Sequence, residues 1–266
     1  LEQWVLEQVG GELATARIHR ANAIAAGAPP DPDRLAELDE IRHAPPVLSD
    51  EDLGGWERDG YVIVRDAAPA RARDELERAI WAHLGATPED PESWYRAELQ
   101  QGIMVQLFHA PGIDEIHAST RIHKAFAQLA GTEDLVMTTD RCGFNRPVLP
   151  GAPYVGARLH FDLPSFEPPV AEHLQAILCL TDTDEDQGAF RCVPGFHRQI
   201  NEWVAELPAG LDPNLADLEA LGPRPVAARG GDLIIWRSTL PHGSGPNMRD
   251  RPRIVHYLTM YPTPSP

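Results

Sequence analysis

The chain has 266 residues, 42% of them hydrophobic, which is enough to bury the core of one large domain. Its formal net charge of −17 argues against nucleic acid as a partner, because binding to phosphates needs clustered lysine and arginine side chains. Three cysteines without a Cys-x-x-Cys pair, no secretion signal and no long apolar run predict a cytoplasmic protein without a membrane span. The composition leaves open whether the protein is a monomer or a homodimer.

Residues 1–45 are predicted to form a helical extension outside the main domain, which we expect to span residues 46–266. Apolar residues recur at helical spacing in the first part of the extension, and the proline-rich run at residues 28–32 ends that helix. A second short helix is expected through Leu35 and Leu38. Because apolar stripes on helices usually face a core, we expect the extension to pack on the main domain or on a second subunit.

The next part of the chain carries helix signals around one short strand. Ser49, followed by an acidic turn, is predicted to cap a helix that ends before Gly60. A strand over residues 61–64 follows. Amphipathic helices are expected over residues 70–84 and 119–129, where apolar residues recur at helical spacing.

From residue 135 onward the pattern changes to short apolar segments separated by turns rich in Gly, Pro and Asp, which predicts antiparallel strands in a sandwich or jelly roll. The fold class is therefore mainly β with helical additions. Residues 199–221 are expected to be helical or irregular and to lie across the open end of the barrel. The predicted strands cover residues 135–139, 157–162, 173–181, 190–193, 233–236 and 254–260.

Two histidines and one aspartate in this β-rich part have a spacing that suits a metal ion. His160 and Asp162 are two positions apart, so in an extended segment both side chains point to the same side. His242 follows the strand predicted at residues 233–236 and can supply a third ligand if that strand lies alongside. Two imidazoles and one carboxylate on one face of an octahedral ion leave three positions open, which is typical of non-haem Fe(II) oxygenases.

A downstream arginine suggests what else the site binds. Arg253 begins the last predicted strand and is expected to point into the same cavity. A guanidinium can bind a carboxylate through two parallel hydrogen bonds, each worth about 1.5–3 kcal/mol. A dicarboxylic 2-oxo acid could therefore chelate iron at its keto acid end while Arg253 and the hydroxyl of Ser244 hold the far carboxylate.

Several motifs resemble those of a known family over roughly residues 46–262. The motifs are Gly60–Val64, Gly188–Phe190, Val193–Arg198, Gly231–Leu233 and His242–Asn247. On these segments the chain is similar to the phytanoyl-CoA dioxygenase family of Fe(II)/2-oxoglutarate-dependent oxygenases. One departure is Gly195-Phe196-His197, where many members have Gly-Ser-His. The departure leaves the metal and cosubstrate positions untouched and bears on the substrate.

The resemblance implies a double-stranded β-helix, the cupin-like jelly roll. It also implies that His160, Asp162 and His242 bind Fe(II) and that Arg253 and Ser244 bind 2-oxoglutarate. In the implied reaction O2 and 2-oxoglutarate are consumed, succinate and carbon dioxide are released, and an unactivated C–H bond of a small molecule is hydroxylated. Desaturation or ring closure could follow the same hydrogen abstraction. The carboxylate of Asp162 disfavours halogenation, because related iron halogenases have a small residue there.

Two hypotheses from other classes stay open. One is a non-catalytic jelly-roll protein that has kept the metal site, and the other is a cupin-type isomerase or dioxygenase that works without 2-oxoglutarate. Arg253 argues against the first, since a bare metal-binding module needs no carboxylate clamp. The second predicts further His or Glu ligands, and the sequence offers none at a matching position.

The sequence limits the substrate only to a secondary metabolite, a lipid-derived acid or an amino-acid-like compound. Arg158 is the best candidate for a substrate contact, because a residue two positions before His160 shares its face in a regular strand. We interpret Arg141, which follows Asp140, as half of a local ion pair. Gln175 could reach the cosubstrate from its predicted strand.

Overall fold

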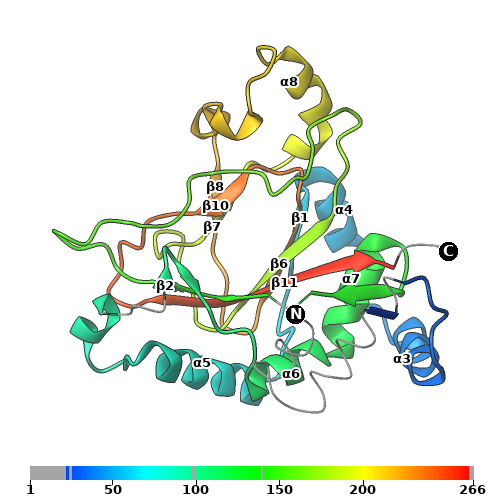
Figure 1. Cartoon of the computed structure of the whole chain (residues 1–266), viewed down its shortest axis with the longest axis horizontal. Coiled ribbons are helices and arrows are strands. Elements are labelled where there is room, and N and C mark those ends of the chain that lie inside the picture. Colours follow the sequence, from blue (N-terminus) through cyan, green and yellow to red (C-terminus); the bar gives the residue numbers. More distant parts are fainter. Residues whose placement is uncertain (1–21, 24–25, 97–99, 139, 264–266) are drawn as a thin grey trace.

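A computed structural model of the chain describes residues 22–23, 26–96, 100–138 and 140–263. Two antiparallel sheets lie at its centre (Figure 1). In spatial order, the larger sheet contains β1 (Tyr61–Val64), β9 (Leu233–Arg237), β6 (Leu174–Cys179), β11 (Arg253–Pro262), β5 (Cys142–Asn145), β3 (Met104–Val105) and β2 (Gln100–Gln101), with β4 (Leu135–Met137) paired to β11. The smaller sheet contains β10 (His242–Ser244), β7 (Phe190–Cys192) and β8 (Arg224–Val226).

Helices cover the face of the larger sheet that points away from the smaller one. Figure 1 shows α5, α6 and α7 below the larger sheet and α8 at the opposite end of the molecule. The helices are α3 (Pro32–His43), α4 (Asp50–Asp59), α5 (Ala70–Leu84), α6 (Pro111–His117), α7 (Thr120–Ala130) and α8 (Ile200–Glu206). Short 3-10 turns cover Pro91–Tyr95, Phe196–Arg198, Pro213–Leu215 and Leu218–Leu221.

The larger sheet separates two apolar clusters, because successive side chains of a strand point to opposite faces. On β6, Ala176 and Leu178 belong to the cluster that packs against the helices. Ile177 and Cys179 belong to the cluster between the two sheets. The space between the sheets is therefore reached by every second residue of the central strands.

The start of the main domain follows from local sequence signals. The Ser49 side chain accepts a hydrogen bond from the amide of Asp52, and the Asp52 carboxylate accepts one from the amide of Ser49, which together form a capping box. Gly60 ends α4 in a left-handed conformation with φ 79°, which favours glycine. The chain then enters β1, which pairs with β9.

Several predicted elements are confirmed. The strand at residues 61–64 and the helix at residues 70–84 coincide with β1 and α5, and the helix predicted at residues 119–129 is shifted by one residue in α7. The strand predicted at residues 157–162 is wrong, since that segment forms only one isolated bridge. Prolines lie on both sides of this segment, at residues 150 and 153 before it and 164 after it, and proline cannot donate a hydrogen bond to a ladder.

The N-terminal extension is described only in part. Residues 1–21 lie outside the described residues, so the first predicted helix is not tested. The second helix, α3, is capped by Asp31 and lies beside α7. Arg34 of α3 donates a hydrogen bond of 2.6 Å to the carbonyl of Leu135, and Lys124 of α7 donates one of 2.9 Å to the carbonyl of Ile41. The boundary between residues 1–45 and 46–266 stays a prediction.

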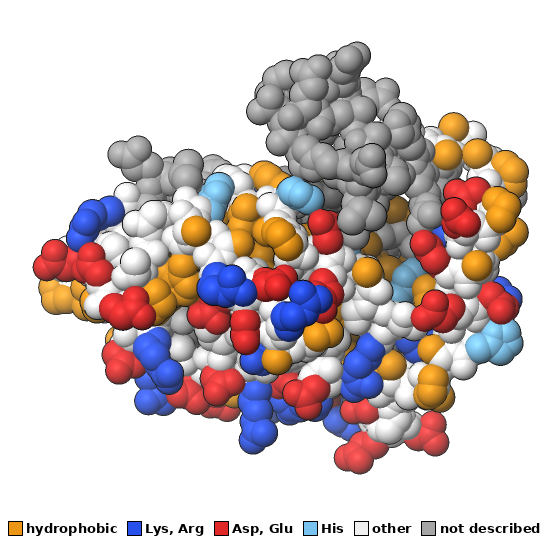
Figure 2. All heavy atoms as spheres, turned by 90° about the horizontal axis from the view of Figure 1, so that it is seen from below, with side chains coloured by type: hydrophobic (Ala, Val, Ile, Leu, Met, Phe, Trp, Pro, Cys, Tyr) orange, Lys and Arg blue, Asp and Glu red, His pale blue; other side chains and the backbone are white. Residues whose placement is uncertain are grey.

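Many charged side chains lie on the outer face of the helical layer. Figure 2, which views the molecule from the helical side, shows acidic and basic groups interleaved over this face. Arg71 of α5, for example, forms ion pairs with Glu75 and with Glu115 of α6. Among the described residues, no helix is both long and apolar enough to cross a bilayer.

Candidate active site

His160 and His242 meet through their backbones. They form an isolated antiparallel bridge in which each amide donates to the carbonyl of the other at 2.9 Å. His242 begins β10, which pairs with β7 in the smaller sheet. One bridge thus fixes the irregular segment around His160 to the edge of the smaller sheet.

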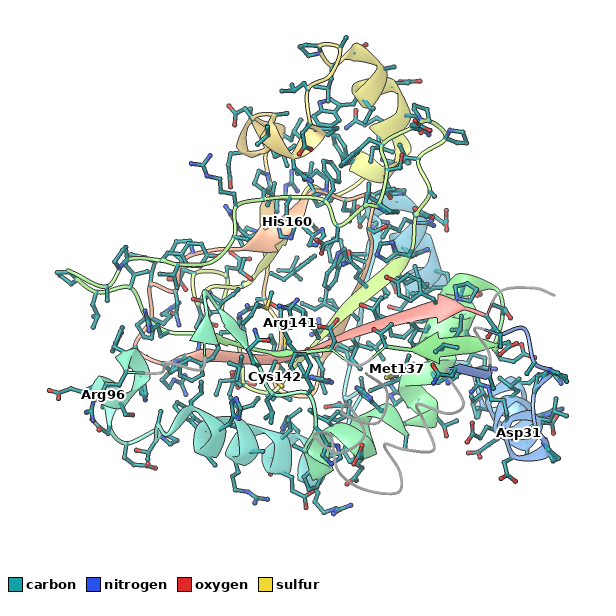
Figure 3. The ribbon with its side chains drawn as sticks, in the orientation of Figure 1. Asp31, Arg96, Met137, Arg141, Cys142 and His160 are labelled. Atoms are coloured by element: carbon teal, nitrogen blue, oxygen red, sulfur yellow. The ribbon has the colours of Figure 1, made fainter. Side chains whose placement is uncertain are left out.

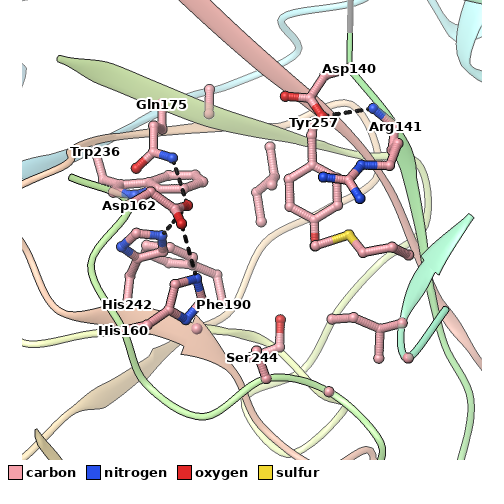
Figure 4. Close-up of a pocket in the computed structure, with 18 of the residues that line it drawn as sticks. Asp140, Arg141, His160, Asp162, Gln175, Phe190, Trp236, His242, Ser244 and Tyr257 are labelled. Carbon is pink, nitrogen blue, oxygen red and sulfur yellow. Dashed lines mark hydrogen bonds and ion pairs between the residues drawn. The ribbon is translucent and has the colours of Figure 1, made fainter. Parts of the chain in front are cut away.

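The predicted metal ligands come together at this bridge (Figure 4). The Nε2 atom of His160 lies 3.5 Å from Oδ1 of Asp162, and the Nε2 atom of His242 lies 3.4 Å from Oδ2 of Asp162. The three ligand atoms all lie within 4.8 Å of one another, and no other group of this kind occurs within the described ranges. This spacing can hold one metal ion.

Hydrogen bonds to the far ring nitrogens fix how the two histidines face the site. Nδ1 of His160 lies 2.7 Å from the carbonyl oxygen of Arg158, and Nδ1 of His242 lies 3.0 Å from that of Leu240. Because a carbonyl only accepts, we infer that Nδ1 carries the proton in both rings. Each Nε2 atom therefore faces the other ligands, where it donates a hydrogen bond to Asp162 when protonated and can coordinate a metal ion when unprotonated.

The carboxylate of Asp162 is held in its ionised form. Hydrogen bonds from His160 and His242 keep the pKa of Asp162 well below its usual range. The pKa of His160 is raised, chiefly by its hydrogen bond with Asp162. Gln175 of β6 donates a further hydrogen bond of 2.9 Å to Oδ2 of Asp162. Two imidazole nitrogens and one ionised carboxylate oxygen are a ligand set that suits a divalent iron ion.

Arg253 lies deeper in the same cavity. The residue is 1% exposed, and its Nη2 donates a hydrogen bond of 3.0 Å to Oγ of Ser244. Its buried Nε has no partner, and no carboxylate of the described residues lies close enough to form an ion pair. A buried charge without a counter-ion is strongly unfavourable. The geometry therefore suits an anionic ligand, such as the carboxylate of a 2-oxo acid.

The cavity that contains these groups has a volume of about 560 Å³, within the range of small-molecule sites. Its walls come from both sheets and from the loop before His160. Phe190 and Trp236 pack around the ring of His242, with ring centroids at 6.2 and 5.1 Å. Asp140 and Arg141 line another part of the wall.

All five residues predicted for metal and cosubstrate line this one cavity: His160, Asp162, His242, Ser244 and Arg253. The side chain of Arg158 does not, since it is exposed and absent from the lining. The prediction for Arg158 assumes a regular strand at residues 157–162, and this strand does not form. Only the backbone carbonyl of Arg158 contacts the site.

The contacts of Arg141 and Gln175 differ from those that the sequence predicted. Asp140 accepts a hydrogen bond of 2.7 Å from the backbone amide of Arg141, whose guanidinium forms no ion pair within the described part of the chain. The interpretation of a local ion pair is therefore wrong. Gln175 contacts the carboxylate of Asp162, which the sequence alone did not reveal.

Comparison with known proteins decides the family. The profile of the phytanoyl-CoA dioxygenase (PhyH) family matches residues 56–255. The chain belongs to this family. A putative phytanoyl-CoA dioxygenase of Dictyostelium discoideum is 20% identical over 258 residues, covering 78% of this chain and 74% of that protein. The ectoine dioxygenase of Halomonas elongata is 26% identical over 273 residues, covering 85% and 77%.

A solved structure supports the fold of this family member. The epimerase SnoN in complex with Fe3+, alpha ketoglutarate and nogalamycin RO aligns with a TM-score of 0.57 at 18% identity, covering 80% of this chain and 83% of that one. The predicted jelly-roll fold is confirmed. Family membership also confirms the predicted class, a non-haem iron and 2-oxoglutarate-dependent dioxygenase.

Proposed function

We propose that the chain hydroxylates an unactivated C–H bond of a small molecule. In this proposal His160, Asp162 and His242 hold Fe(II), while Arg253 and Ser244 hold the far carboxylate of 2-oxoglutarate. Iron and 2-oxoglutarate together supply the activation of O2, with succinate and carbon dioxide as products. The substrate takes the remaining space of the cavity.

The observation that carries the proposal is the buried guanidinium of Arg253 beside a three-ligand metal site. A protein that only stores or senses a metal has no use for an uncompensated buried cation in the same cavity. A carboxylate ligand removes this cost and gains charge-assisted hydrogen bonds. Arg253 therefore favours an enzyme that binds a 2-oxo acid over the non-catalytic alternative.

The protein's own groups orient the reactants and limit water. The hydrogen bonds to Nδ1 hold both histidines with Nε2 toward the ion. Phe190 and Trp236 fix the ring of His242 from the sides and give the site an apolar wall. Such a wall strengthens the electrostatic interactions of bound anions, because it keeps the local dielectric low.

Anaerobic addition of Fe(II) and 2-oxoglutarate, followed by oxygen, tests the proposal. We expect a weak visible charge-transfer band, then succinate release and a product that has gained one oxygen atom. A product that has instead lost two hydrogen atoms identifies desaturation or ring closure. A folded protein that binds iron but never consumes 2-oxoglutarate refutes the proposal.

Substitution of Arg253 tests the cosubstrate site. Arg253→Gln is expected to raise the KM for 2-oxoglutarate by roughly 10- to 100-fold, the loss expected for one or more charge-assisted hydrogen bonds. Arg249→Gln is the matched control, because Arg249 is exposed and pairs with Asp184 and Asp186 at the surface. An unchanged KM in the Arg253 variant contradicts the assignment.

A further inference from the structure

After metal and cosubstrate are assigned, one cation of the cavity is left without a role. The charged residues that line the cavity within the described ranges are Asp140, Arg141, Asp162 and Arg253. Asp162 faces the metal site, and Arg253 faces the cosubstrate. Arg141 is the remaining basic side chain, and its neighbour Asp140 is the remaining acid.

The backbone holds Arg141 at the cavity wall. The residue directly precedes β5, and its carbonyl accepts a hydrogen bond of 3.0 Å from the amide of Tyr257 in β11. Figure 3 shows Arg141 between His160 and Cys142, and Cys142 belongs to the cluster on the helical side of the sheet. Figure 4 shows the guanidinium of Arg141 beside the ring of Tyr257, on the other side of the pocket from the metal ligands.

The guanidinium of Arg141 makes no direct ion pair with a described carboxylate, although the charge of Arg141 acts on nearby Asp140 through space. Across the part of the chain that the structure describes, no hydrogen bond or ion pair engages it, although other arginines are paired, such as Arg237 with Glu57 and Glu172. The carboxyl of Asp140 bonds to the backbone amide of Arg141 instead. Burial raises the pKa of Asp140, and the nearby charge of Arg141 offsets this only in part.

We propose that Arg141 binds an anionic group, a carboxylate or a phosphonate, of the molecule that is oxidised. The inference rests on the proposed function, because it requires that the metal ligands and Arg253 are already engaged. A guanidinium binds either anion through paired hydrogen bonds, and partial burial strengthens them relative to a surface contact. The substrate then spans the cavity, with its anionic end at Arg141 and a C–H bond toward His160 and Asp162.

The substrate class follows from this anchor and from the cavity size. Iron, 2-oxoglutarate and substrate share about 560 Å³, which favours a small acid over a long-chain lipid. In the proposed function Arg253, the other arginine in the wall, holds the far carboxylate of 2-oxoglutarate together with Ser244, so it is not available to the anion of the substrate. Neutral analogues of the substrate should therefore bind poorly.

Matched pairs of compounds test the anchor with the iron-loaded protein and 2-oxoglutarate. The probes are small carboxylic acids with their primary amides, and small phosphonates with their neutral diesters, read out by compound-dependent succinate release. We expect acids of one kind, carboxylic or phosphonic, to stimulate release at concentrations at least about tenfold below their neutral partners, as loss of one charge-assisted hydrogen bond requires. The arm that responds identifies the anion.

Substitutions distinguish a role of Arg141 in substrate binding from a role in binding the metal or 2-oxoglutarate. Arg141→Gln is expected to raise the KM of the stimulating acid at least about tenfold, while the KM for 2-oxoglutarate and the uncoupled succinate release stay within about twofold. Arg141→Lys should recover part of the loss, because it restores the charge without the paired geometry. Arg249→Gln is again the matched control and should behave as wild type, since Arg249 is exposed and outside the cavity.

Three results overturn the anchor and leave the proposed function intact: no acid outperforms its neutral partner, Arg141→Gln leaves the KM of the acid unchanged, or the same variant raises the KM for 2-oxoglutarate instead. Failure of the proposed function looks different. Wild-type protein would then form no charge-transfer band with Fe(II) and 2-oxoglutarate and would release no succinate with or without any compound.

Discussion

At the residue level, the orientation of the Asp162 carboxylate depends on residues that are distant in the sequence as well as on its neighbours. Without an ion its oxygens face both histidines and also accept a hydrogen bond from Gln175. A bound ion would take the Nε2 lone pairs of both histidines, and Gln175 would then remain as a side-chain donor to the carboxylate of Asp162. Outer partners of this kind commonly determine how well a ligand is placed.

Gln175→Leu is therefore expected to lower the affinity for Fe(II) by roughly 10- to 100-fold, the usual cost of losing an outer-shell partner of a metal ligand. Anaerobic titration with Fe(II) in the presence of 2-oxoglutarate measures this. Thr259→Val is the matched control, because Thr259 lies opposite Gln175 in the sheet and lines the cavity. Equal affinities of the two variants would show that Gln175 has no orienting role.

At the level of elements, the segment that carries two of the ligands is irregular and needs support from outside. The 3-10 turn Pro213–Leu215 supplies it: Asn214 accepts a hydrogen bond of 2.7 Å from the amide of Phe161 and donates one of 3.3 Å to its carbonyl. Phe161 also packs against Trp203 of α8. The predicted covering segment thus holds the ligand loop in place.

Asn214→Ala removes both bonds to Phe161 and should weaken Fe(II) binding about tenfold, since each net hydrogen bond contributes about 0.5–1.5 kcal/mol. Hydrogen exchange should also become faster around residues 158–163. Asn201→Ala is the control, because Asn201 makes the same kind of bond, 2.9 Å from the amide of Val170, farther along the same loop. If both variants bind Fe(II) with equal affinity, the hydrogen bonds of Asn214 do not position the metal ligands.

The elements that sequence predicted well are those defined by local signals. The capping box at Ser49 and the helical spacing within residues 70–84 act within a few residues of each other, so the pattern alone fixes them. The metal ligands were also found, because His160 and Asp162 share a side even without a regular strand. The sequence did not reveal that Arg141 lines the cavity or that Asn214 supports the ligand loop, because both contacts bring together segments that are far apart in the chain.

Contact between α5 and α6 depends on a glycine. A Cβ at Gly112 would lie 2.5 Å from the carbonyl oxygen of Ala72 and 2.7 Å from the amide nitrogen of Leu76, both backbone atoms that cannot turn away. Gly112→Ala should lower the free energy of unfolding by about 1–3 kcal/mol, as overpacking does. Gly54→Ala is the control with the opposite sign, because its Cβ meets nothing within 4 Å in the helix α4. Urea unfolding measures both, and equal effects would contradict this packing argument.

For the molecule as a whole, strand β11 connects the catalytic side with the helical side. Arg253, Tyr257 and Thr259 line the cavity, whereas His256 points to the opposite face. There His256 is fully buried, with Nε2 3.0 Å from Nε2 of His117 and Nδ1 3.6 Å from Sγ of Cys142. The imidazole of His256, which is packed beneath the helical layer, is therefore uncharged at neutral pH.

This imidazole makes the stability of the whole protein depend on pH. Burial lowers the pKa of His256 to about 4, so between pH 4 and its ordinary value of 6.5 the unfolded chain binds more protons than the folded one. The stability contribution of neutral His256 is complete above pH 6.5 and is lost as the pH falls toward 4. The expected loss is about 3 kcal/mol, at about 1.4 kcal/mol for each pKa unit.

Free energies of unfolding from urea titrations at pH 4.5 and pH 7 measure this loss. Burial also lowers the pKa of His123, His173 and His197, whereas the pKa of His160 is raised and acts with the opposite sign, so a smaller dependence should persist when His256 is replaced. His256→Gln removes the titrating group and should flatten most of the pH dependence, whatever its effect on stability at pH 7. A variant that loses stability as steeply as wild type between these pH values would place the responsible group elsewhere than on β11.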